Sequence, residues 1–238
     1  MNISLNNYKK LSGSMLKIIA IITMLIDHSA LILRSELPFI NTPLFSVGSS
    51  NITIYFIMRK IGRLAFPLFC FLISEGVANT KNIKKYCIRL FMFAIISEIP
   101  FNLMTSGKFI YPAKQNIYFT LLLGVLIIYI YNNVKNELVT FALMSLVAAL
   151  SIIMRVDYGL HGVLIILLMH VLKNSPLLRF FLSYPLLSGG FAALAAFIPI
   201  SLYNNKRGFI KSNSLKFAFY FFYPLHILLL IAIKFILK

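Results

Sequence analysis

Acidic side chains are scarce in this chain, whose 238 residues include 6 Asp and Glu against 23 Lys and Arg, and no tryptophan. Charged residues make up 12% of the chain, whereas a soluble domain has about a quarter. Hydrophobic residues make up 60%, and the mean hydropathy is +0.87. This shortage of charge excludes an ordinary soluble fold and predicts an integral membrane protein.

Several motifs of soluble enzymes are also missing. The sequence has no P-loop, no GxSxG and no HExxH motif, which excludes the usual sites for ATP hydrolysis, the serine-hydrolase elbow and zinc. Its two cysteines, Cys70 and Cys87, are neither a CxxC pair nor spaced as metal ligands. We therefore expect no metal.

The net charge of +17 has a simple explanation in a membrane protein. Lys and Arg flank membrane spans and contact anionic lipid headgroups. In a soluble protein the same charge would suggest nucleic acid. Here we expect the lipid bilayer as partner, no nucleic acid, and a minority of basic residues that bind an anionic ligand.

Long apolar runs predict an all-α fold, a polytopic transmembrane helix bundle of eight to nine spans in a single integral membrane domain, residues 1–238. At about 20 residues per span, the spans fall at residues 14–33, 62–78, 90–104, 117–131, 138–154, 160–172, 177–203 and 217–237. The first lacks a signal-peptide cleavage site, so we expect it in the mature protein. Pro185, Gly189 and Gly190 make 177–203 one broken span or two short ones. Within the long connection 35–60, the apolar piece 52–58 is too short to span, and we expect an interfacial or re-entrant segment.

Basic clusters predict the orientation of the chain. The N-terminal side of the first span carries Lys9, Lys10 and, in its first turn, Lys17, which indicate a cytoplasmic N terminus. After the second span, on one expected helical stretch, stand Lys81, Lys84, Lys85 and Arg89, also expected in the cytoplasm. Before the last span stand Lys206, Arg207, Lys211 and Lys216. This third cluster would lie outside with eight spans and inside with nine.

Ionisable residues inside spans are functional candidates by default, because a charge at the bilayer centre costs at least about 2.5 kcal/mol. Four of the six acids lie in or at the ends of apolar helices: Asp27, Glu75, Glu98 and Asp157. Three of the four histidines have similar settings: His28, His161 and His226.

Lys17 and His28 are eleven residues apart, close to three helical turns, and so share a face. An imidazole can remove a proton from an amine or hydroxyl that attacks a carbonyl; a core histidine is the structural alternative. Asp27 points about 100 degrees away from His28, so we expect an orienting carboxylate from Glu75 or Glu98.

Glu75 and Glu98 should face the bundle interior, with Arg63 as the expected partner, in a site or in a packing ion pair. The basic stripe of residues 81–89 suits the phosphates of coenzyme A, and equally suits lipid headgroups. A polar pair, Gln115 and Asn116, precedes the fourth span.

Two further blocks place polar groups together. In RVDYGLHG, Asp157 stands at a natural helix cap beside Tyr158, with His161 four residues on. In FYFFYPLHIL, Tyr223 and His226 share a face beside Pro224, although Tyr220 and Tyr223 also suit an aromatic belt.

Six blocks resemble the TraX family, membrane proteins named for N-terminal acetylation of the F-type conjugative pilin. They are LKIIAIITMLIDH, GRLAFPLFCFLISEG, TKNIKKYCIRLFMFAIISEIPFNL, QNIYFTLLLG, DYGLHGVLII and FYFFYPLH. The family is distantly similar to the membrane-bound acyltransferase 3 type. Those enzymes separate a basic residue and a histidine by ten residues in the first helix, as Lys17 and His28 do. They also have an arginine-containing basic motif, to which the stretch with Lys84, Lys85 and Arg89 is loosely similar. Some of the arginines of that motif are lysines in this chain.

The resemblance implies a transmembrane-acyltransferase-like fold in a bacterial cell membrane. It implies transfer of an acetyl group from cytoplasmic acetyl-coenzyme A (acetyl-CoA) to an amine, such as a peptide or pilin N terminus, or to a hydroxyl. The catalytic candidates are His28, Asp27, Glu75 and Glu98. The candidates for binding substrate or cofactor are Lys17, Arg63, Lys84, Lys85, Arg89, Gln115, Asn116, Asp157, Tyr158, His161, Tyr223 and His226.

The sequence does not determine whether the acceptor is a peptide, a glycan or a lipid. It also does not determine whether the acetyl group is transferred directly or through a covalent intermediate on His28.

Two other functions fit the same residues. A small proton-coupled transporter or flippase would use the buried acids and histidines as a relay. A membrane assembly protein of a conjugation or secretion system would need them only for packing.

Overall fold

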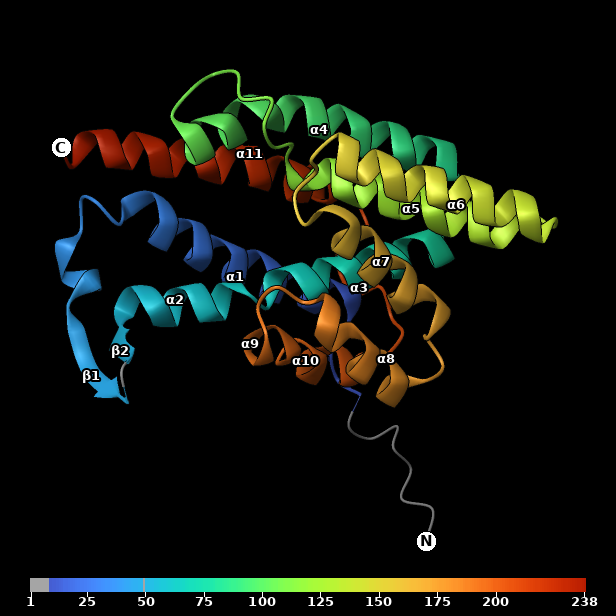
Figure 1. Ribbon diagram of the computed structural model, residues 1–238, viewed down its shortest axis with the longest axis horizontal. Coiled ribbons are helices and arrows are strands. Elements are labelled where there is room, and N and C mark those ends of the chain that lie inside the picture. The colour runs from blue at the N-terminus through green and yellow to red at the C-terminus, as the bar shows by residue number, and fades with distance from the viewer. Residues whose placement is uncertain (1–8, 49) are drawn as a thin grey trace, which may run out of the picture. The chain divides into compact units, whose positions relative to one another are not determined.

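Helices make up most of the chain in the computed structural model, which describes residues 9–48 and 50–238 (Figure 1). The chain divides into two compact units. The terminal unit comprises Met1–Leu68 and Gly189–Lys238, and the central unit comprises Phe69–Ser188. The expected single domain stays a prediction.

In the terminal unit, α1 (Gly13–Leu33) packs against α2 (Ile54–Gly62) and α11 (Asn213–Ile236). The Ser12 side chain caps α1 by accepting a hydrogen bond from the backbone of Met15. The terminal unit also contains η2 (Pro38–Asn41), β1 (Pro43–Val47), β2 (Ser50–Thr53), the first residues of α3 (Ala65–Asn79), α9 (Phe191–Leu194) and α10 (Phe197–Ser201).

Helices α1 and α11 run in the same direction. The loop before α11 pairs with the segment before α1 through a parallel bridge between Leu11 and Tyr203. Gly13 and Ser14 then donate backbone hydrogen bonds to the carbonyls of Lys206 and Arg207, at 2.8 and 2.9 Å. Since both helices start at this loop and contact each other, they are parallel neighbours.

The central unit is built around α5 (Ile117–Asn133), which contacts α4 (Ile83–Ser106), α6 (Glu137–Ile153) and α7 (Gly159–Val171). A side chain at Gly124 of α5 would overlap Ile166 of α7, so glycine allows this close contact. The unit ends with α8 (Pro176–Ser183) and η3 (Tyr184–Leu186).

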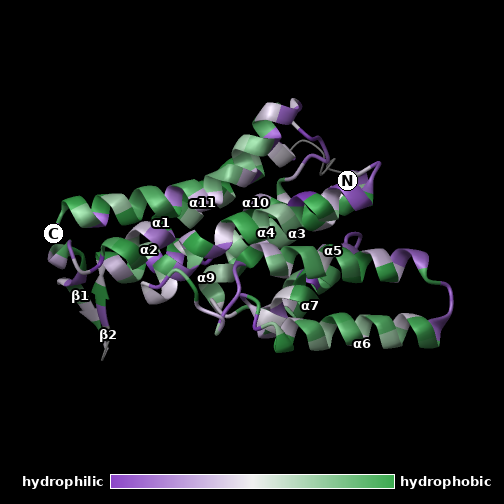
Figure 2. Ribbon diagram, turned by 90° about the horizontal axis from the view of Figure 1, so that it is seen from above, coloured by the Kyte–Doolittle hydropathy of each residue, from purple (hydrophilic) through white to green (hydrophobic). Residues whose placement is uncertain are grey.

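The outward faces of the helices are apolar, as expected for contact with lipid. Figure 2 shows hydrophobic residues along most of the helices. On α6 the exposed side chains include Leu138, Phe141 and Ile153, whereas a helix in water would turn polar residues outward. The membrane prediction is therefore supported in its general form.

Four helical segments of the described chain are long and apolar enough to cross a membrane: Gly13–Leu33, Ile54–Asn79, Ile83–Ser106 and Asn213–Ile236. Shorter apolar helical segments occur at Ile117–Asn133, Glu137–Ile153, Gly159–Val171 and Phe191–Ser201. Eight or nine spans stay a prediction. The expected break around Pro185 is present, because residues 177–203 form several short helices.

Residues 35–60 differ from the expectation. They contain a two-stranded antiparallel sheet, β1 with β2, which the all-α prediction missed. Residues 54–58 begin α2, which leads into α3, so this piece belongs to the second candidate span and is not a separate re-entrant segment. The hairpin left no alternating signal because every residue of β1 is exposed.

Candidate functional site

Two histidines from α1 and α11 form the centre of the terminal unit's polar site. Nδ1 of His28 lies 2.7 Å from Nε2 of His226. The ring planes differ by 1° and the ring centroids are 5.0 Å apart. That separation fits a hydrogen bond in the plane of both rings better than a face-to-face stack. Tyr223 lies beside the pair, its ring centroid 6.1 Å from His28 and 5.9 Å from His226.

The neighbours of the pair determine where its protons are. Nδ1 of His226 lies 2.7 Å from the carbonyl oxygen of Phe222. A carbonyl can only accept, so this Nδ1 carries a proton, and in the neutral ring Nε2 is an acceptor. His28 must then donate from its own Nδ1, which leaves its Nε2 unprotonated. A second hydrogen-bonding partner thus fixes His28 in the tautomer of a general base.

The partner of His28 differs from the expectation. A carboxylate from Glu75 or Glu98 was predicted to orient it, but His226 occupies the Nδ1 position. His28 belongs to the terminal unit, and Glu75 and Glu98 belong to the central unit. Their meeting in one cavity stays a prediction.

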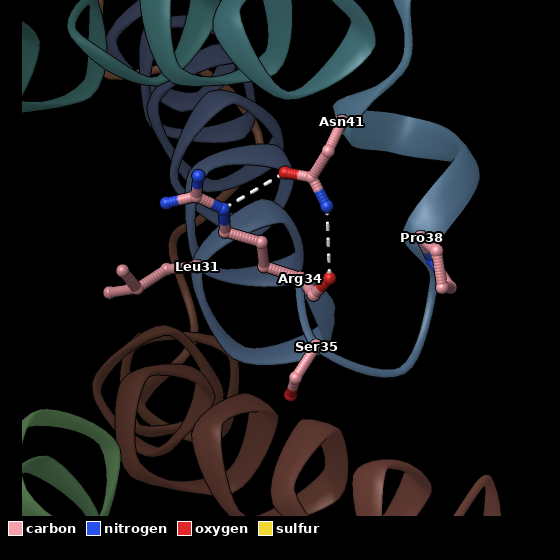
Figure 3. A pocket seen from close by; sticks show the side chains of 5 residues that line it. All are labelled: Leu31, Arg34, Ser35, Pro38 and Asn41. Atoms are coloured by element: carbon pink, nitrogen blue, oxygen red, sulfur yellow. Dashed lines mark hydrogen bonds between the residues drawn. The ribbon is translucent and has the colours of Figure 1, made fainter.

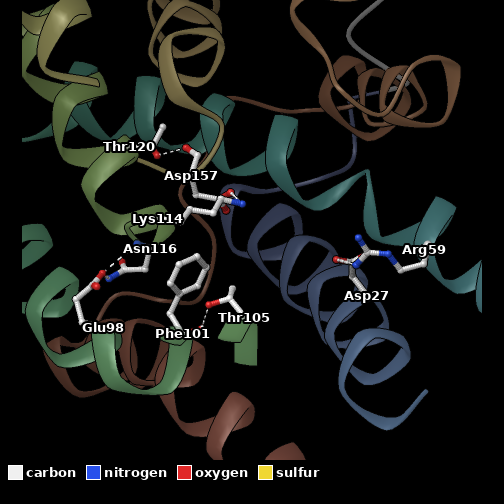
Figure 4. A network of polar contacts seen from close by, with 9 residues as sticks. All are labelled: Asp27, Arg59, Glu98, Phe101, Thr105, Lys114, Asn116, Thr120 and Asp157. Carbon is white, nitrogen blue, oxygen red and sulfur yellow. Dashed lines mark hydrogen bonds and ion pairs between the residues drawn. The ribbon is translucent and has the colours of Figure 1, made fainter. Parts of the chain in front are cut away.

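Asp27 faces a different helix from its neighbour His28, as the helical period requires. Its carboxylate forms an ion pair of 2.7 Å with Arg59 of α2 (Figure 4). The side chains are 19% and 22% exposed. At Gly62, one turn on from Arg59, any side chain would overlap Asp27, so glycine lets α2 come close to α1. Sequence reasoning missed Arg59 because it placed this stretch outside a helix.

Lys17 lies on α1, eleven residues before His28, and the positive charges of Arg207 and Lys216 repel its ammonium group. The segments 9–17 and 203–216 meet here and carry no acid. We call this the basic end of the terminal unit; its cations are Lys9, Lys10, Lys17, Lys206, Arg207, Lys211 and Lys216. A surface of this kind attracts anions.

A pocket lies near the other end of α1 (Figure 3). Nε of Arg34 donates to the side-chain oxygen of Asn41 at 2.9 Å, and the Asn41 amide donates to the Arg34 carbonyl at 3.2 Å. Leu31, Ser35 and Pro38 complete the lining. Arg34 also stacks 4.3 Å from the ring centroid of Tyr55, so this end of α1 is held by several contacts.

In the central unit, Glu98 of α4 is bound to Asn116, the cap of α5 (Figure 4). It accepts from the Asn116 backbone at 3.0 Å and also from the Asn116 side-chain amide. The amide also donates to the Ala94 carbonyl at 2.7 Å. Arg63, the predicted partner of Glu98, lies in the terminal unit, where Gly189 leaves room for it. Asn116 is therefore the partner of Glu98 within the central unit, and the expected pairing with Arg63 stays a prediction.

Asp157 does not cap α7, and that prediction is wrong. Its carboxylate forms an ion pair of 2.7 Å with Lys114, while Tyr158, at φ 62°, occupies the cap position without a side-chain cap bond. The Asp157 backbone donates to the Gln115 carbonyl at 2.9 Å and accepts from the Thr120 hydroxyl. These contacts join the starts of α5 and α7.

Other predicted residues lie at the surface of the central unit. His161 is exposed on α7. Lys84 and Lys85 are exposed on the first turns of α4, and the Arg89 guanidinium lies 5.8 Å from the Tyr86 ring. Lys81 precedes the helix, so the predicted stripe lacks it.

Arg179 is a candidate that sequence reasoning missed. It is buried on α8, 5.4 Å from the Phe71 ring centroid, and the Glu75 carboxylate attracts it. The rule that selected Glu75, an ionisable residue within an apolar run, applies equally to this arginine. In the part of the chain that is described, no group of three or more His, Cys, Asp or Glu side chains could hold a metal.

Comparisons with known proteins cover nearly the whole chain. A family model described as "TraX protein" matches residues 12–234. A "Probable fimbrial assembly protein FimC, serogroup H1" of Dichelobacter nodosus is 30% identical, over 95% of this chain and 97% of that protein. No solved structure matches the chain. The matched stretch includes both histidines of the pair.

Proposed function

Because the chain belongs to the TraX family, we propose that it is a membrane-embedded acetyltransferase that uses acetyl-CoA and has His28 as its general base. The observation that carries this proposal is the hydrogen-bond chain from the Phe222 carbonyl through His226 to His28. Nε2 of His28 is then unprotonated and lies between two apolar helices. A polar group costs free energy in such surroundings, so we expect this nitrogen to have a function.

The chemistry balances with these groups. The lone pair of the acceptor amine or hydroxyl attacks the carbonyl carbon of the thioester, and Nε2 of His28 takes the proton that the nucleophile loses. When the tetrahedral intermediate collapses, the C–S bond breaks, and Nε2 returns the proton to the leaving thiolate. Throughout, Nδ1 of His28 donates to His226, which holds the ring in place. General-base catalysis of this kind contributes about 10²- to 10⁴-fold.

The basic end is the proposed docking surface for the phosphates of the donor. It lies where α1 begins, and Lys17 is about 16 Å from His28 along that helix. Phosphates are attracted by its seven cations, and the positive-inside rule puts such a surface in the cytoplasm. The stripe with Lys84, Lys85 and Arg89 is the alternative surface for the same phosphates.

The acceptor that we favour is the N-terminal amine of a pilus or fimbrial subunit. The name of the Dichelobacter nodosus relative supports a role in fimbrial assembly, and the resemblance implies pilin acetylation. The pocket beside Arg34 lies beyond His28 on α1, on the opposite side from the basic end, and offers the acceptor a separate approach.

The test is acetyl transfer by the purified protein in lipid nanodiscs, with acetyl-CoA and peptides that copy pilin N termini. Mass spectrometry of the peptides should reveal an added acetyl group with wild type and none with His28→Gln. The matched control is His170→Gln. Like His28, His170 is a histidine within a helix that bonds to another side chain, because its Nε2 lies 3.1 Å from Oδ1 of Asn132. Equal transfer by wild type and His28→Gln would reject His28 as the base.

A role in assembly without catalysis is the second candidate, and the name of the Dichelobacter nodosus relative favours it. It predicts that His28→Gln restores pilus or fimbrial assembly in a strain lacking the gene, provided that the variant folds.

A proton-coupled transporter would use the histidine pair as a relay and release no coenzyme A, so a free-thiol assay distinguishes it from the enzyme.

A further inference from the structure

Helix α8 of the central unit has its polar residues inside and its apolar residues outside. Leu177 and Phe181 are 74% and 65% exposed, whereas Arg179 is 7% exposed and Ser183 is fully buried. Apolar exposure suits contact with lipid, but an arginine on the inner face is expensive unless something neutralises it. The polar pair therefore needs an explanation.

Each inward side chain has a buried polar atom without a hydrogen-bond partner in the described part of the chain. Nε of Arg179 and Oγ of Ser183 are buried with no partner among the described residues. Arg179 also forms no ion pair within 9–48 and 50–238. The two residues are four apart, so they lie on one face of α8. Buried donors are normally satisfied, so two unsatisfied polar atoms on one face of a helix indicate that an acceptor binds there.

The opposite wall is α3. The Arg179 guanidinium lies 5.4 Å from the ring centroid of Phe71, which covers it with an aromatic surface. Glu75, one turn further along α3, attracts Arg179 but is not in an ion pair with any residue that the structure describes. The central unit thus holds two opposite charges that attract each other without forming an ion pair.

We infer that α8 and α3 form a binding site for a small zwitterionic group, with its anion on Arg179 and Ser183 and its ammonium toward Glu75. A phosphate or carboxylate would accept from the guanidinium and the hydroxyl. Glu75 would repel a simple anion, and Arg179 would repel a simple cation. A group that carries both charges is attracted by both side chains.

The residues of this site belong to the central unit and the paired histidines to the terminal unit, and the inference does not depend on acetyl transfer. The shared chemistry is an ammonium close to an anion, as in a phosphoethanolamine headgroup or a free amino acid. The first experiment measures the thermal stability of the detergent-solubilised full chain by size-exclusion chromatography after heating. O-phosphoethanolamine or glycine should stabilise it, and inorganic phosphate or ethanolamine at equal concentration should not.

Variants test each arm of the site. Arg179→Gln should raise the half-maximal stabilising concentration at least tenfold, while Lys173→Gln, an exposed cation just before α8, should leave it unchanged. Glu75→Gln should remove the preference for O-phosphoethanolamine over phosphate. If no zwitterion stabilises wild type, if phosphate does so equally well, or if Arg179→Gln responds like wild type, the inference is wrong.

Ligand-free stability separates binding from packing. A binding arginine without its ligand is an unpaired buried charge, so Arg179→Met should unfold at the same or a higher temperature than wild type. A lower unfolding temperature would mean that Arg179 is a packing residue, and would overturn the inference even if the variant also failed to respond to ligands.

Nanodiscs identify the source of the zwitterion. In phosphatidylglycerol, whose headgroup has no ammonium, added O-phosphoethanolamine should stabilise the protein. If phosphatidylethanolamine nanodiscs abolish this response and raise the unfolding temperature of wild type but not of Arg179→Gln, the ligand is a lipid headgroup. If the response is the same in both lipids, the site takes a soluble zwitterion.

Discussion

His28 and His226 are 198 positions apart in the sequence, yet Nδ1 of the first lies 2.7 Å from Nε2 of the second, in coplanar rings. This bond joins α1 to α11 and fixes the tautomers of both rings. In many other general-base sites a carboxylate orients the catalytic imidazole. Here His226 orients the His28 ring, and it does so without adding a negative charge.

His226→Phe should lower kcat for acetyl transfer about 10- to 100-fold and leave KM for acetyl-CoA within about twofold, because outer partners of this kind orient the reacting group without binding substrate. Steady-state kinetics in nanodiscs would measure both constants. A rise in KM with unchanged kcat would mean that His226 binds substrate directly and does not position His28.

Breaking the ion pair of Asp27 and Arg59 should destabilise the terminal unit. Asp27→Asn removes the carboxylate that Arg59 binds, and Arg59→Gln removes the guanidinium that Asp27 binds, so we expect a loss of about 2 kcal/mol for each. Equilibrium unfolding of the two single variants and the double variant gives their coupling. Additive effects would show that the pair contributes nothing to stability.

Gly62→Ala should destabilise the packing of α1 against α2 by about 1–3 kcal/mol, because the new methyl group overlaps the Asp27 side chain. The same unfolding measurement should find a smaller loss in an Asp27→Gly background, where the overlapping Oδ1, Cγ and Cβ atoms are all removed. An equal loss in both backgrounds would place the effect in the glycine backbone and not in the contact.

The parallel arrangement of α1 and α11 predicts that the C terminus lies outside the cytoplasm. Both helices start at the basic end, so if both cross the membrane the number of spans is odd, which favours nine over eight. Alkaline phosphatase fused after Lys238 should be active, and green fluorescent protein inserted at Asn205 should fluoresce. A fluorescent fusion at Lys238 would contradict this topology.

The sequence by itself determined the class of protein and most of its candidate residues. The apolar runs at 14–33 and 90–104 fall within α1 and α4, and the run at 217–237 falls within α11 except for its last residue, because the hydropathy that favours insertion into lipid is a local property of the sequence. The expense of polar groups in lipid was enough to single out His28 and His226. It would also have found Arg179, had the same rule been applied to residues 177–203.

Only the tertiary structure decided which side chains meet. Glu98 binds Asn116, His28 binds His226, and Asp157 binds Lys114 in place of capping α7. Helical periodicity gives the face on which a residue lies, but it does not say which helix packs against that face. That choice depends on the shapes of whole helix surfaces, such as the gap that Gly62 leaves for Asp27.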